Sequence, residues 1–130
     1  MDLEFAAGNT DGDPRTFTMP LNEDGIIDWE PAIRTILKEL VQGERVPLIA
    51  NRFLATLGQT IVEVARREAK PLVVLSGGCF QNAPLLETTV ARLREAGFTP
   101  LWSHEAPPND GGLALGQAVI ATAPLDATNP

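Results

Sequence analysis

Two glycine-bearing segments carry the residue types best suited to binding a phosphorylated ligand. The first is SGGCFQN, residues 76–82, and the second is APPNDGG, residues 106–112. Glycine lacks a Cβ, so backbone N–H groups in both segments can approach a phosphate or a ribose closely. Neither segment is a Walker A motif, because no lysine follows, and neither contains G-x-G-x-x-G. Since a pair of glycines after a strand is most often only a turn, the ligand hypothesis depends on where the two segments lie.

Three side chains near these glycines have two interpretations each. Asp110 follows Asn109 and either caps the next helix or holds a hard metal ion and orients water. His104 reaches the same site only if the intervening loop folds back, and a lone histidine at a strand end is more often a surface residue. Cys79 is expected to be a small packed residue, since no partner histidine for a nucleophilic role is evident.

The second half of the chain predicts a strand, a helix, a strand and a helix. The apolar run PLVVL, residues 71–75, is typical of a strand buried on both faces of a parallel sheet. A helix is predicted over residues 83–97, followed by a strand in residues 98–104 and a helix of small residues over 113–123. The first of these helices ends at Gly97, and its predicted inward residues are Leu85, Leu86, Val90 and Leu93. This order implies an α/β layered fold with a right-handed crossover.

That fold gives the two glycine segments a common place. In open α/β sheets ligands gather at the carboxyl ends of the strands, and each segment follows a strand. If the strands are neighbours, the Gly77–Gly78 pair and the Gly111–Gly112 pair face one crevice. The helix that begins near Asn82 or Pro84 then points the positive end of its dipole at the same crevice.

The first half of the chain is predicted to be mostly helical. Residues 15–21 alternate and contain β-branched and aromatic side chains, which predicts a short strand, and NEDG, residues 22–25, predicts a turn. A helix follows, with Asp28 as N-cap and Gly43 as its end. A second long helix covers residues 46–69, and its predicted apolar stripe is Ile49, Phe53, Leu57, Ile61, Val64 and Ala65.

Length and composition favour one soluble domain. We expect a flexible lead-in over residues 1–14, a single lobe over residues 15–123 and a frayed tail over residues 124–130 of the 130-residue chain. The net charge of −7 and the scattered basic residues disfavour nucleic-acid binding. No apolar run is long enough to span a membrane, and the N-terminus lacks the features of a signal peptide. With a single cysteine, these features predict a cytoplasmic protein.

The two glycine segments in their wider context resemble a known family. VVLSGGCFQNAPLLE (residues 73–87) followed by PPNDGGLALGQAVIA (residues 107–121) looks like the C-terminal end of the HypF carbamoyltransferases, which mature [NiFe]-hydrogenases. The helical stretches of residues 27–43 and 49–65 are similar to the same family, so the likeness covers about residues 17–122. It implies one ribonuclease H-like lobe of the actin/Hsp70-like ATPase fold, with an N-terminal helical portion. The tRNA threonylcarbamoyladenosine transferases and O-carbamoyltransferases are more distant relatives.

The resemblance also implies a reaction and a set of site residues. Members of the family use carbamoyl phosphate and ATP to form a carbamoyl adenylate, and they transfer the carbamoyl group to the C-terminal cysteine of HypE. By similarity, the nucleotide-binding residues are Ser76, Gly77, Gly78, Asn82, Asn109, Gly111 and Gly112. Asp110 matches the aspartate that ligates a divalent metal, for which zinc, iron and magnesium stay open.

Departures from the family pattern limit what this chain is expected to do alone. The other metal ligands of the family are two histidines in an H-x-x-x-H pattern, whereas His104 is the only histidine here. The first lobe and the other HypF domains are also missing, so we expect activity to require them. The expected partners are a HypE-like protein, the missing lobe and, through an exposed apolar patch, a second copy. The alternative is a non-catalytic partner-binding or regulatory module in hydrogenase maturation.

Overall fold

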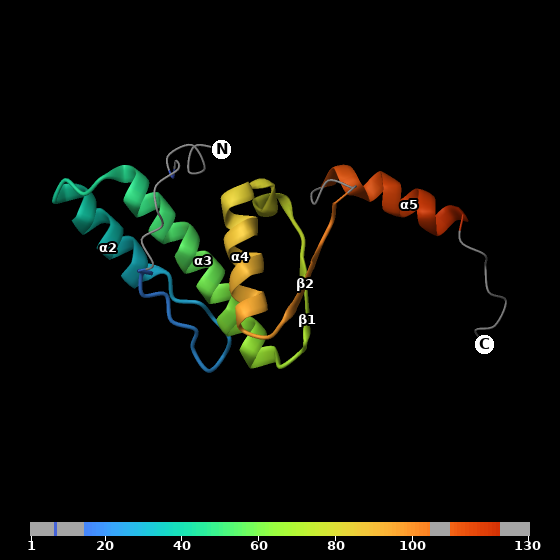
Figure 1. The fold of residues 1–130 in the computed structure, drawn as a ribbon, viewed down its shortest axis with the longest axis horizontal. Helices are drawn as coiled ribbons and strands as arrows, with labels where there is room; N and C mark the ends of the chain where they lie inside the picture. The colour runs from blue at the N-terminus through green and yellow to red at the C-terminus, as the bar shows by residue number, and fades with distance from the viewer. Residues whose placement is uncertain (1–6, 8–14, 105–109, 123–130) are drawn as a thin grey trace.

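The computed structural model describes Ala7, residues 15–104 and residues 110–122 (Figure 1). Along the chain the elements are helices α2 and α3, strand β1, a 3-10 turn, helix α4, strand β2, a second 3-10 turn and helix α5. Their bounds are α2 Glu30–Val41, α3 Val46–Glu68, β1 Leu72–Leu75, η1 Gly78–Gln81, α4 Ala83–Glu95, β2 Thr99–Trp102, η2 Asp110–Gly112 and α5 Leu113–Thr122. The predicted α/β class is therefore confirmed.

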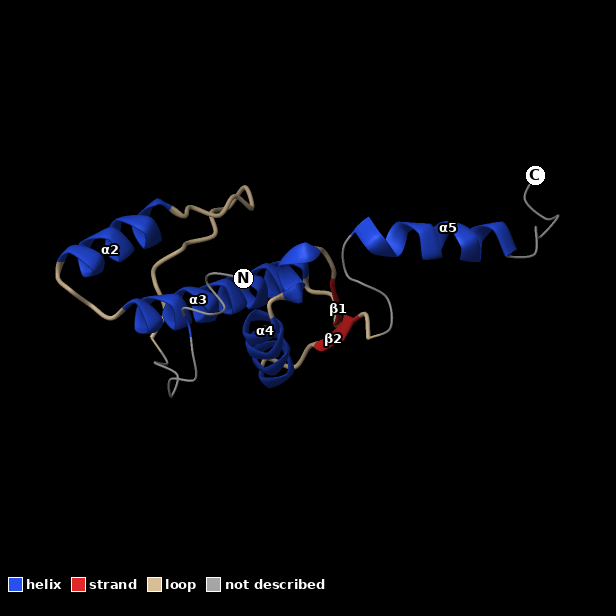
Figure 2. Cartoon of the chain, turned by 90° about the horizontal axis from the view of Figure 1, so that it is seen from above, coloured by secondary structure: helices blue, strands red, loops and turns tan. Residues whose placement is uncertain are grey.

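The two strands form a parallel pair joined through α4. Leu72 lies opposite Thr99, and Leu75 lies opposite Trp102. Helices α3 and α4 lie on one side of this pair, and α5 projects away on the other side (Figure 2). The core between helices and strands is an apolar cluster that includes Val62, Leu75, Val90 and Leu93. The predicted strand–helix–strand unit is confirmed in its order and in its parallel pairing.

Local signals account for α4. Asn82 is its N-cap, and Oδ1 of that side chain accepts a hydrogen bond of 2.9 Å from the N–H of Leu85. At the other end Gly97 has φ +86°, and the N–H of Phe98 donates to the carbonyl of Leu93 at 2.9 Å. This left-handed glycine followed by a six-to-one hydrogen bond is the usual stop signal of a helix, so the predicted end at Gly97 is confirmed. Of the two predicted starts, near Asn82 or Pro84, the structure has Asn82 as the N-cap.

The start of α2 differs by one position from the prediction. Trp29, in a helical conformation, is the N-cap, and its side chain makes no capping hydrogen bond. Asp28 lies one residue earlier, where its Oδ1 accepts from the N–H of Glu30 at 3.0 Å. Asp28 therefore satisfies a free N–H group of the first turn from outside the helix. The predicted end is correct, because Gly43 has φ +79° and its N–H bonds to the carbonyl of Leu40.

Helix α3 buries a wider face than the predicted stripe. Phe53, Leu57, Ile61 and Val64 are only partly buried, whereas the fully buried residues of α3 include Ile49, Ala50, Leu54, Ala55, Val62 and Ala65. The reason is that α3 is covered on more than one side. It packs against α4 and, in separate clusters, against residues that precede it in the chain. A helix buried in this way does not keep a single apolar stripe.

Residues 15–21 are not the predicted strand. They run along α3, where the N–H of buried Phe17 donates to Oγ1 of Thr56 at 2.8 Å, and the extended pairing is limited to one bridge between Leu21 and Ile27. Alternation was therefore misleading, because the backbone donor is satisfied by a helix side chain instead of a neighbouring strand. The predicted turn is confirmed: the N–H of Gly25 bonds to the carbonyl of Asn22 at 3.1 Å.

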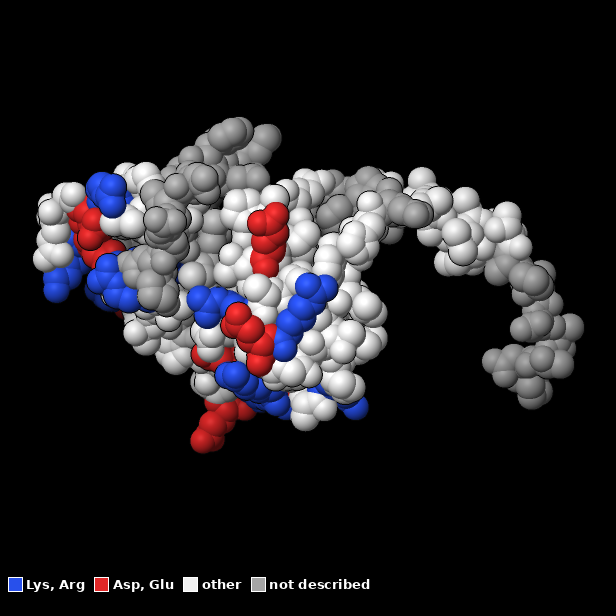
Figure 3. Space-filling model, in the orientation of Figure 1, with Lys and Arg blue, Asp and Glu red and all other residues white. Residues whose placement is uncertain are grey.

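The sheet is covered on one face only within the described residues. Leu72, Val74 and Leu101 are 53%, 68% and 45% exposed, so the expectation that the first strand is buried on both faces is wrong for this chain. Helix α5 is likewise uncovered, since none of its ten residues is buried. Charged side chains lie over α2, α3 and α4 but not on α5, whose sequence contains none (Figure 3). Apolar surface of this extent is typical of an interface.

The predicted lead-in and tail lie outside the described residues, apart from Ala7. The carbonyl of Ala7 accepts a 2.7 Å hydrogen bond from Nδ2 of Asn51, and the residue packs against Ala50, Leu54 and Leu85. No helix of the described part of the chain is long and apolar enough to cross a membrane.

Candidate functional site

The first glycine segment forms a sharp turn between β1 and α4. Its backbone leaves the strand through Gly77, whose φ of +105° and ψ of 158° are accessible in practice only to glycine. A Cβ at this position would meet only Sγ of Cys79, at 4.0 Å. The glycine is therefore required by the backbone conformation and not by crowding. Exposed Ser76 and Gly78 flank it, so the turn presents backbone and a hydroxyl group to the outside.

Asn82 closes this turn and starts α4. The N–H of Phe80 donates to the carbonyl of Gly77 at 3.1 Å, and the N–H of Asn82 donates to the carbonyl of Cys79 at 3.2 Å. Because Oδ1 of Asn82 caps α4, a ligand contact by this side chain would fall to its Nδ2 donor. Asn82, which was predicted to bind nucleotide, thus also has a structural role as the cap of α4. The sequence alone did not distinguish the two roles.

The second glycine segment follows β2 and starts α5. Gly111 is exposed and Gly112 half-buried in the short 3-10 turn that precedes Leu113. Asn109 and the side chain of Asp110 lie outside the described residues, so their predicted contacts stay predictions.

The two glycine segments lie at the same end of the sheet. Since β1 and β2 are parallel and adjacent, with Leu75 opposite Trp102, the chain leaves both strands in the same direction. Figure 1 shows the turn after β1 and the start of α5 beyond this common end. The N-terminus of the 13-residue helix α4 is at the same end, so its dipole favours an anion there. The structure therefore supports the predicted shared location.

His104 and Cys79 flank this end without forming a reactive pair. The ring centroids of His104 and Trp102 lie 4.8 Å apart. The Trp102 ring has a second contact, with the guanidinium carbon of Arg94 at 5.6 Å from the ring centroid. Cys79 is exposed, which corrects the expectation of a packed residue. The 3-10 turn directs its neighbour Phe80 into the core instead.

The described residues do not assemble a metal centre by themselves. Among them, no three His, Cys, Asp or Glu side chains are grouped closely enough to hold an ion. A carboxylate such as that of Asp110 suits a hard cation, but one carboxylate does not hold it tightly. Any metal bound here would require ligands beyond this part of the chain.

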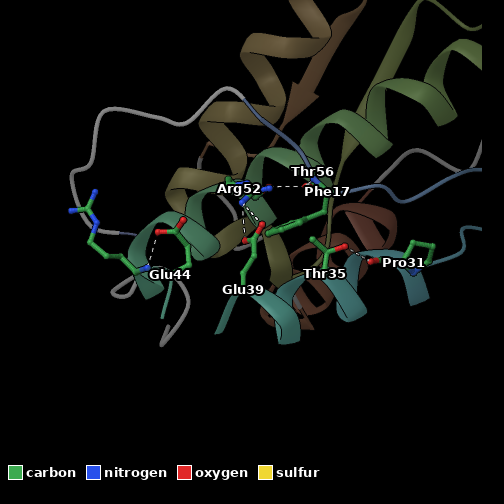
Figure 4. Close-up of polar contacts among 8 residues, drawn as sticks. Phe17, Pro31, Thr35, Glu39, Glu44, Arg52 and Thr56 are labelled. Atoms are coloured by element: carbon green, nitrogen blue, oxygen red, sulfur yellow. Dashed lines mark hydrogen bonds and ion pairs between the residues drawn. The ribbon is translucent and has the colours of Figure 1, made fainter. Parts of the chain in front are cut away.

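Sequence reasoning missed a polar cluster that joins residues 15–21 to α2 and α3. Nη1 of buried Arg52 lies 2.7 Å from both Oε1 and Oε2 of Glu39, and its guanidinium carbon lies 4.4 Å from the ring centroid of Phe17 (Figure 4). Thr56 adds two bonds, accepting from the N–H of Phe17 and donating to the carbonyl of Arg52. The partners are too far apart in sequence for a local pattern to reveal them. The cluster holds three segments of the fold together and lies apart from the glycine turns.

The comparisons with known proteins agree with this geometry. Residues 1–117 match the family model described as carbamoyltransferase, Kae1-like domain, second subdomain. The chain is 43% identical over 91 residues to carbamoyltransferase HypF of Synechocystis, and 39% identical over 107 residues to that of Rhodobacter capsulatus. These alignments cover 70% and 79% of this chain but only 12% and 14% of the relatives.

Solved structures extend the agreement to three dimensions. A crystal structure of full-length HypF in the phosphate- and nucleotide-bound form matches with a TM-score of 0.80 and 31% identity, covering 98% of this chain and 17% of that one. The structure of T. kodakarensis HypF matches with a TM-score of 0.70 and 27% identity, covering 92% and 16%. The fold is thus that of the second subdomain of a Kae1-like carbamoyltransferase domain.

The chain belongs to the HypF carbamoyltransferase family. It corresponds to the second subdomain of the Kae1-like domain and spans about one-eighth of the length of the curated relatives named above.

Proposed function

We propose that this chain forms one wall of a carbamoyltransferase site and acts together with the other parts of a HypF-type polypeptide. In the proposed reaction, water cleaves carbamoyl phosphate to carbamate and phosphate. A carbamate oxygen then attacks the α-phosphorus of ATP, so that a carbamoyl adenylate forms and pyrophosphate leaves with the electron pair of the broken phosphorus–oxygen bond. The thiolate of the C-terminal cysteine of a HypE-like protein then attacks the carbamoyl carbon. A carbon–sulfur bond forms and AMP leaves with the electron pair of the broken carbon–oxygen bond, the thiol having lost its proton to solvent before the attack.

The observation that carries this proposal is the common position of the two glycine turns. Both follow adjacent parallel strands, and Gly77 adopts a conformation that only glycine readily allows. Such turns at the carboxyl edge of a parallel sheet are well suited to nucleotide phosphates. The full-length HypF matched by this chain carries a phosphate and a nucleotide, which supports nucleotide binding by the family.

Each predicted residue then has a distinct part. Ser76 and the Gly77–Gly78 backbone would contact the nucleotide, and Asn82 would donate from Nδ2 while its Oδ1 keeps capping α4. Asn109, Gly111 and Gly112 would close over the phosphates. Asp110 would contribute one carboxylate to a divalent cation, which would supply neutralisation of phosphate charge.

The remaining polypeptide would supply the opposite wall. The uncovered sheet face, with Val74 as its most exposed strand residue, indicates where more protein is needed. A site with one wall does not exclude water, and water would hydrolyse a reactive adenylate. We therefore assign the activity to the assembled protein and not to this chain alone.

Isothermal titration with ATP and a divalent cation tests the proposal. The two samples are this chain and a chimera in which it replaces the aligned segment of the Synechocystis HypF. We expect binding in the chimera, and its loss in the chimera carrying Asp110→Ala. The matched control is Asp24→Ala, which removes an exposed aspartate from the turn at residues 22–25. Equal binding by parent and Asp110→Ala would contradict the assigned role of Asp110, and no binding by the chimera would contradict the nucleotide site.

A further inference from the structure

The turn that carries Gly77 is fixed to the core of the protein by one side chain. The chain enters this turn from buried Leu75 at the end of β1 and leaves it at Asn82, the N-cap of α4. Among residues 76–82, all of which the structure describes, Phe80 alone packs against the apolar cluster around Leu93. The exposed residues of the turn are Ser76, Gly78, Cys79 and Gln81. Phe80 is therefore the apolar anchor of a turn that is otherwise largely exposed.

The backbone of Phe80 belongs to the same turn. Its N–H donates to the carbonyl of Gly77 at 3.1 Å, and the N–H of Asn82 donates to the carbonyl of Cys79 at 3.2 Å. These bonds form a 3-10 helix of four residues, Gly78–Gln81, which is too short to be stable without tertiary contacts. The ring of Phe80 supplies such contacts. The position of this ring therefore decides where Gly77 and Asn82 lie.

We propose that Phe80 is the positioning residue of the nucleotide-binding turn. Its ring, held in the core, keeps the Gly77–Gly78 backbone and Nδ2 of Asn82 in the arrangement that receives the nucleotide. The inference rests on the proposed function, because it assumes that a nucleotide binds at this turn. Phe80 itself does not contact the nucleotide and acts through the backbone of its neighbours.

The two adjacent glycines make such an anchor necessary. Glycine has more backbone freedom than other residues, so an unanchored turn would lose more conformational entropy when it binds a ligand. Backbone N–H groups that are already in place bind a phosphate without that cost. A Cβ at Gly77 would meet only Sγ of Cys79, at 4.0 Å, so crowding does not hold this glycine in place. The constraint comes instead from Phe80, three residues later.

Phe98 provides a matched control. Its side chain is also partly buried and packs against the same apolar cluster. It lies just before β2, whose first residue, Thr99, pairs with Leu72 at the start of β1. Phe98 is therefore at the end of the sheet opposite to the glycine turns. Phe80→Ala and Phe98→Ala remove the same group from one core, so both should destabilise the protein. Only Phe80→Ala removes the anchor of the turn.

Kinetics of carbamoyl transfer by the chimera with the Synechocystis HypF tests the proposal, at a temperature where all variants are folded. We expect Phe80→Ala to raise the KM for ATP at least about tenfold, with kcat changed less than about threefold, because ordering of the turn is then lost on binding. Phe98→Ala should leave the KM for ATP within about twofold of the parent. Phe80→Leu keeps an apolar anchor and should recover most of the affinity. An equal KM for ATP in Phe80→Ala and Phe98→Ala would overturn the proposal.

Hydrogen exchange on the chain itself gives a test that needs no nucleotide. The N–H of Leu85 donates to Oδ1 of Asn82, so its exchange reports the exit of the turn. We expect the amides at positions 80 and 85 to exchange at least about tenfold faster in Phe80→Ala than in Phe98→Ala, under conditions that equalise exchange at Val62 in the core of α3. Equal exchange in the two variants would contradict the anchoring role.

The two experiments separate this inference from the proposed function. A chimera that does not bind ATP contradicts the nucleotide site, while exchange at Leu85 still decides whether Phe80 anchors the turn. A chimera that binds ATP equally well with Phe80→Ala and Phe98→Ala retains the nucleotide site and contradicts the positioning role of Phe80.

Discussion

Arg52 of α3 and Glu39 of α2 form a buried ion pair in which Nη1 lies 2.7 Å from both carboxylate oxygens. The side chains are only 9% and 18% exposed, and the ring of Phe17 covers the guanidinium group. Three segments distant in sequence meet at this pair. It therefore holds the helical portion of the chain to the segment that precedes it.

Removal of one partner of this pair should destabilise the protein strongly. Glu39→Ala leaves a buried guanidinium without its carboxylate, so we expect a loss of about 3 kcal/mol in the free energy of unfolding measured with urea. The control is Glu30→Ala, which breaks the exposed pair with Arg34 on the same helix. That change should cost about 0.5 kcal/mol or less. Equal losses for the two variants would contradict a structural role for the buried pair.

Thr56 should stabilise residues 15–21 through its hydroxyl group. Thr56→Val keeps the shape but leaves the buried N–H of Phe17 without its 2.8 Å acceptor. We expect this to cost about 1–3 kcal/mol in the free energy of unfolding. Thr56→Ser retains the hydroxyl and should cost less. If valine and serine are equally well tolerated, the hydrogen bond does not hold this segment.

Gly77 should not tolerate a side chain, even though there is space for one. Gly77→Ala forces a Cβ into a backbone conformation that costs about 1–3 kcal/mol, although its nearest neighbour would be 4.0 Å away. Gly116→Ala is the control, because Gly116 lies in α5 and a Cβ there would meet no atom within 4 Å beyond its own stretch of helix. Alanine there should be neutral or stabilising. The free energy of unfolding of both variants, measured with urea, tests this prediction. An equal free energy for Gly77→Ala and Gly116→Ala would contradict a conformational requirement for glycine at position 77.

Asn82 offers a way to separate helix capping from nucleotide binding. Asn82→Ala removes the cap of α4 and should cost about 1 kcal/mol in stability. Asn82→Asp retains a capping oxygen, so stability should be preserved, but it replaces the Nδ2 donor with a negative charge. In the chimera we therefore expect Asn82→Asp to weaken ATP binding while the unfolding temperature stays near that of the parent. Unchanged ATP affinity would limit Asn82 to its capping role.

Local chemistry explains which elements could be predicted from the sequence. The start of α4 at Asn82 and its end at Gly97 depend on residues within a few positions of each other, as does the stop of α2 at Gly43. Burial depends on distant partners, and there the prediction was wrong. Residues 15–21 alternate like a strand but pack on α3. Val74 lies in an apolar run typical of a buried strand but is exposed in this chain.

The candidate site was predictable to a similar extent. The spacing of the glycine segments placed both after strands, and the parallel pairing of β1 with β2 brings them to one end of the sheet. Exposed Cys79 was wrongly expected to be packed, because the 3-10 turn that directs Phe80 inward has no clear sequence signal. The Arg52–Glu39 pair was missed, since no periodic pattern connects residues thirteen apart on two helices.

The most direct measurement is the transfer of a carbamoyl group to the C-terminal cysteine of a HypE protein, followed by intact-protein mass spectrometry. The chimera containing this chain would be supplied with ATP, carbamoyl phosphate and a divalent cation. We expect the mass of one carbamoyl group on HypE, dependent on ATP, retained with Asp24→Ala and lost with Asp110→Ala. A folded chimera that binds ATP but never modifies HypE, or one whose Asp110→Ala variant is fully active, would contradict the proposal that this chain forms a wall of a carbamoyltransferase site.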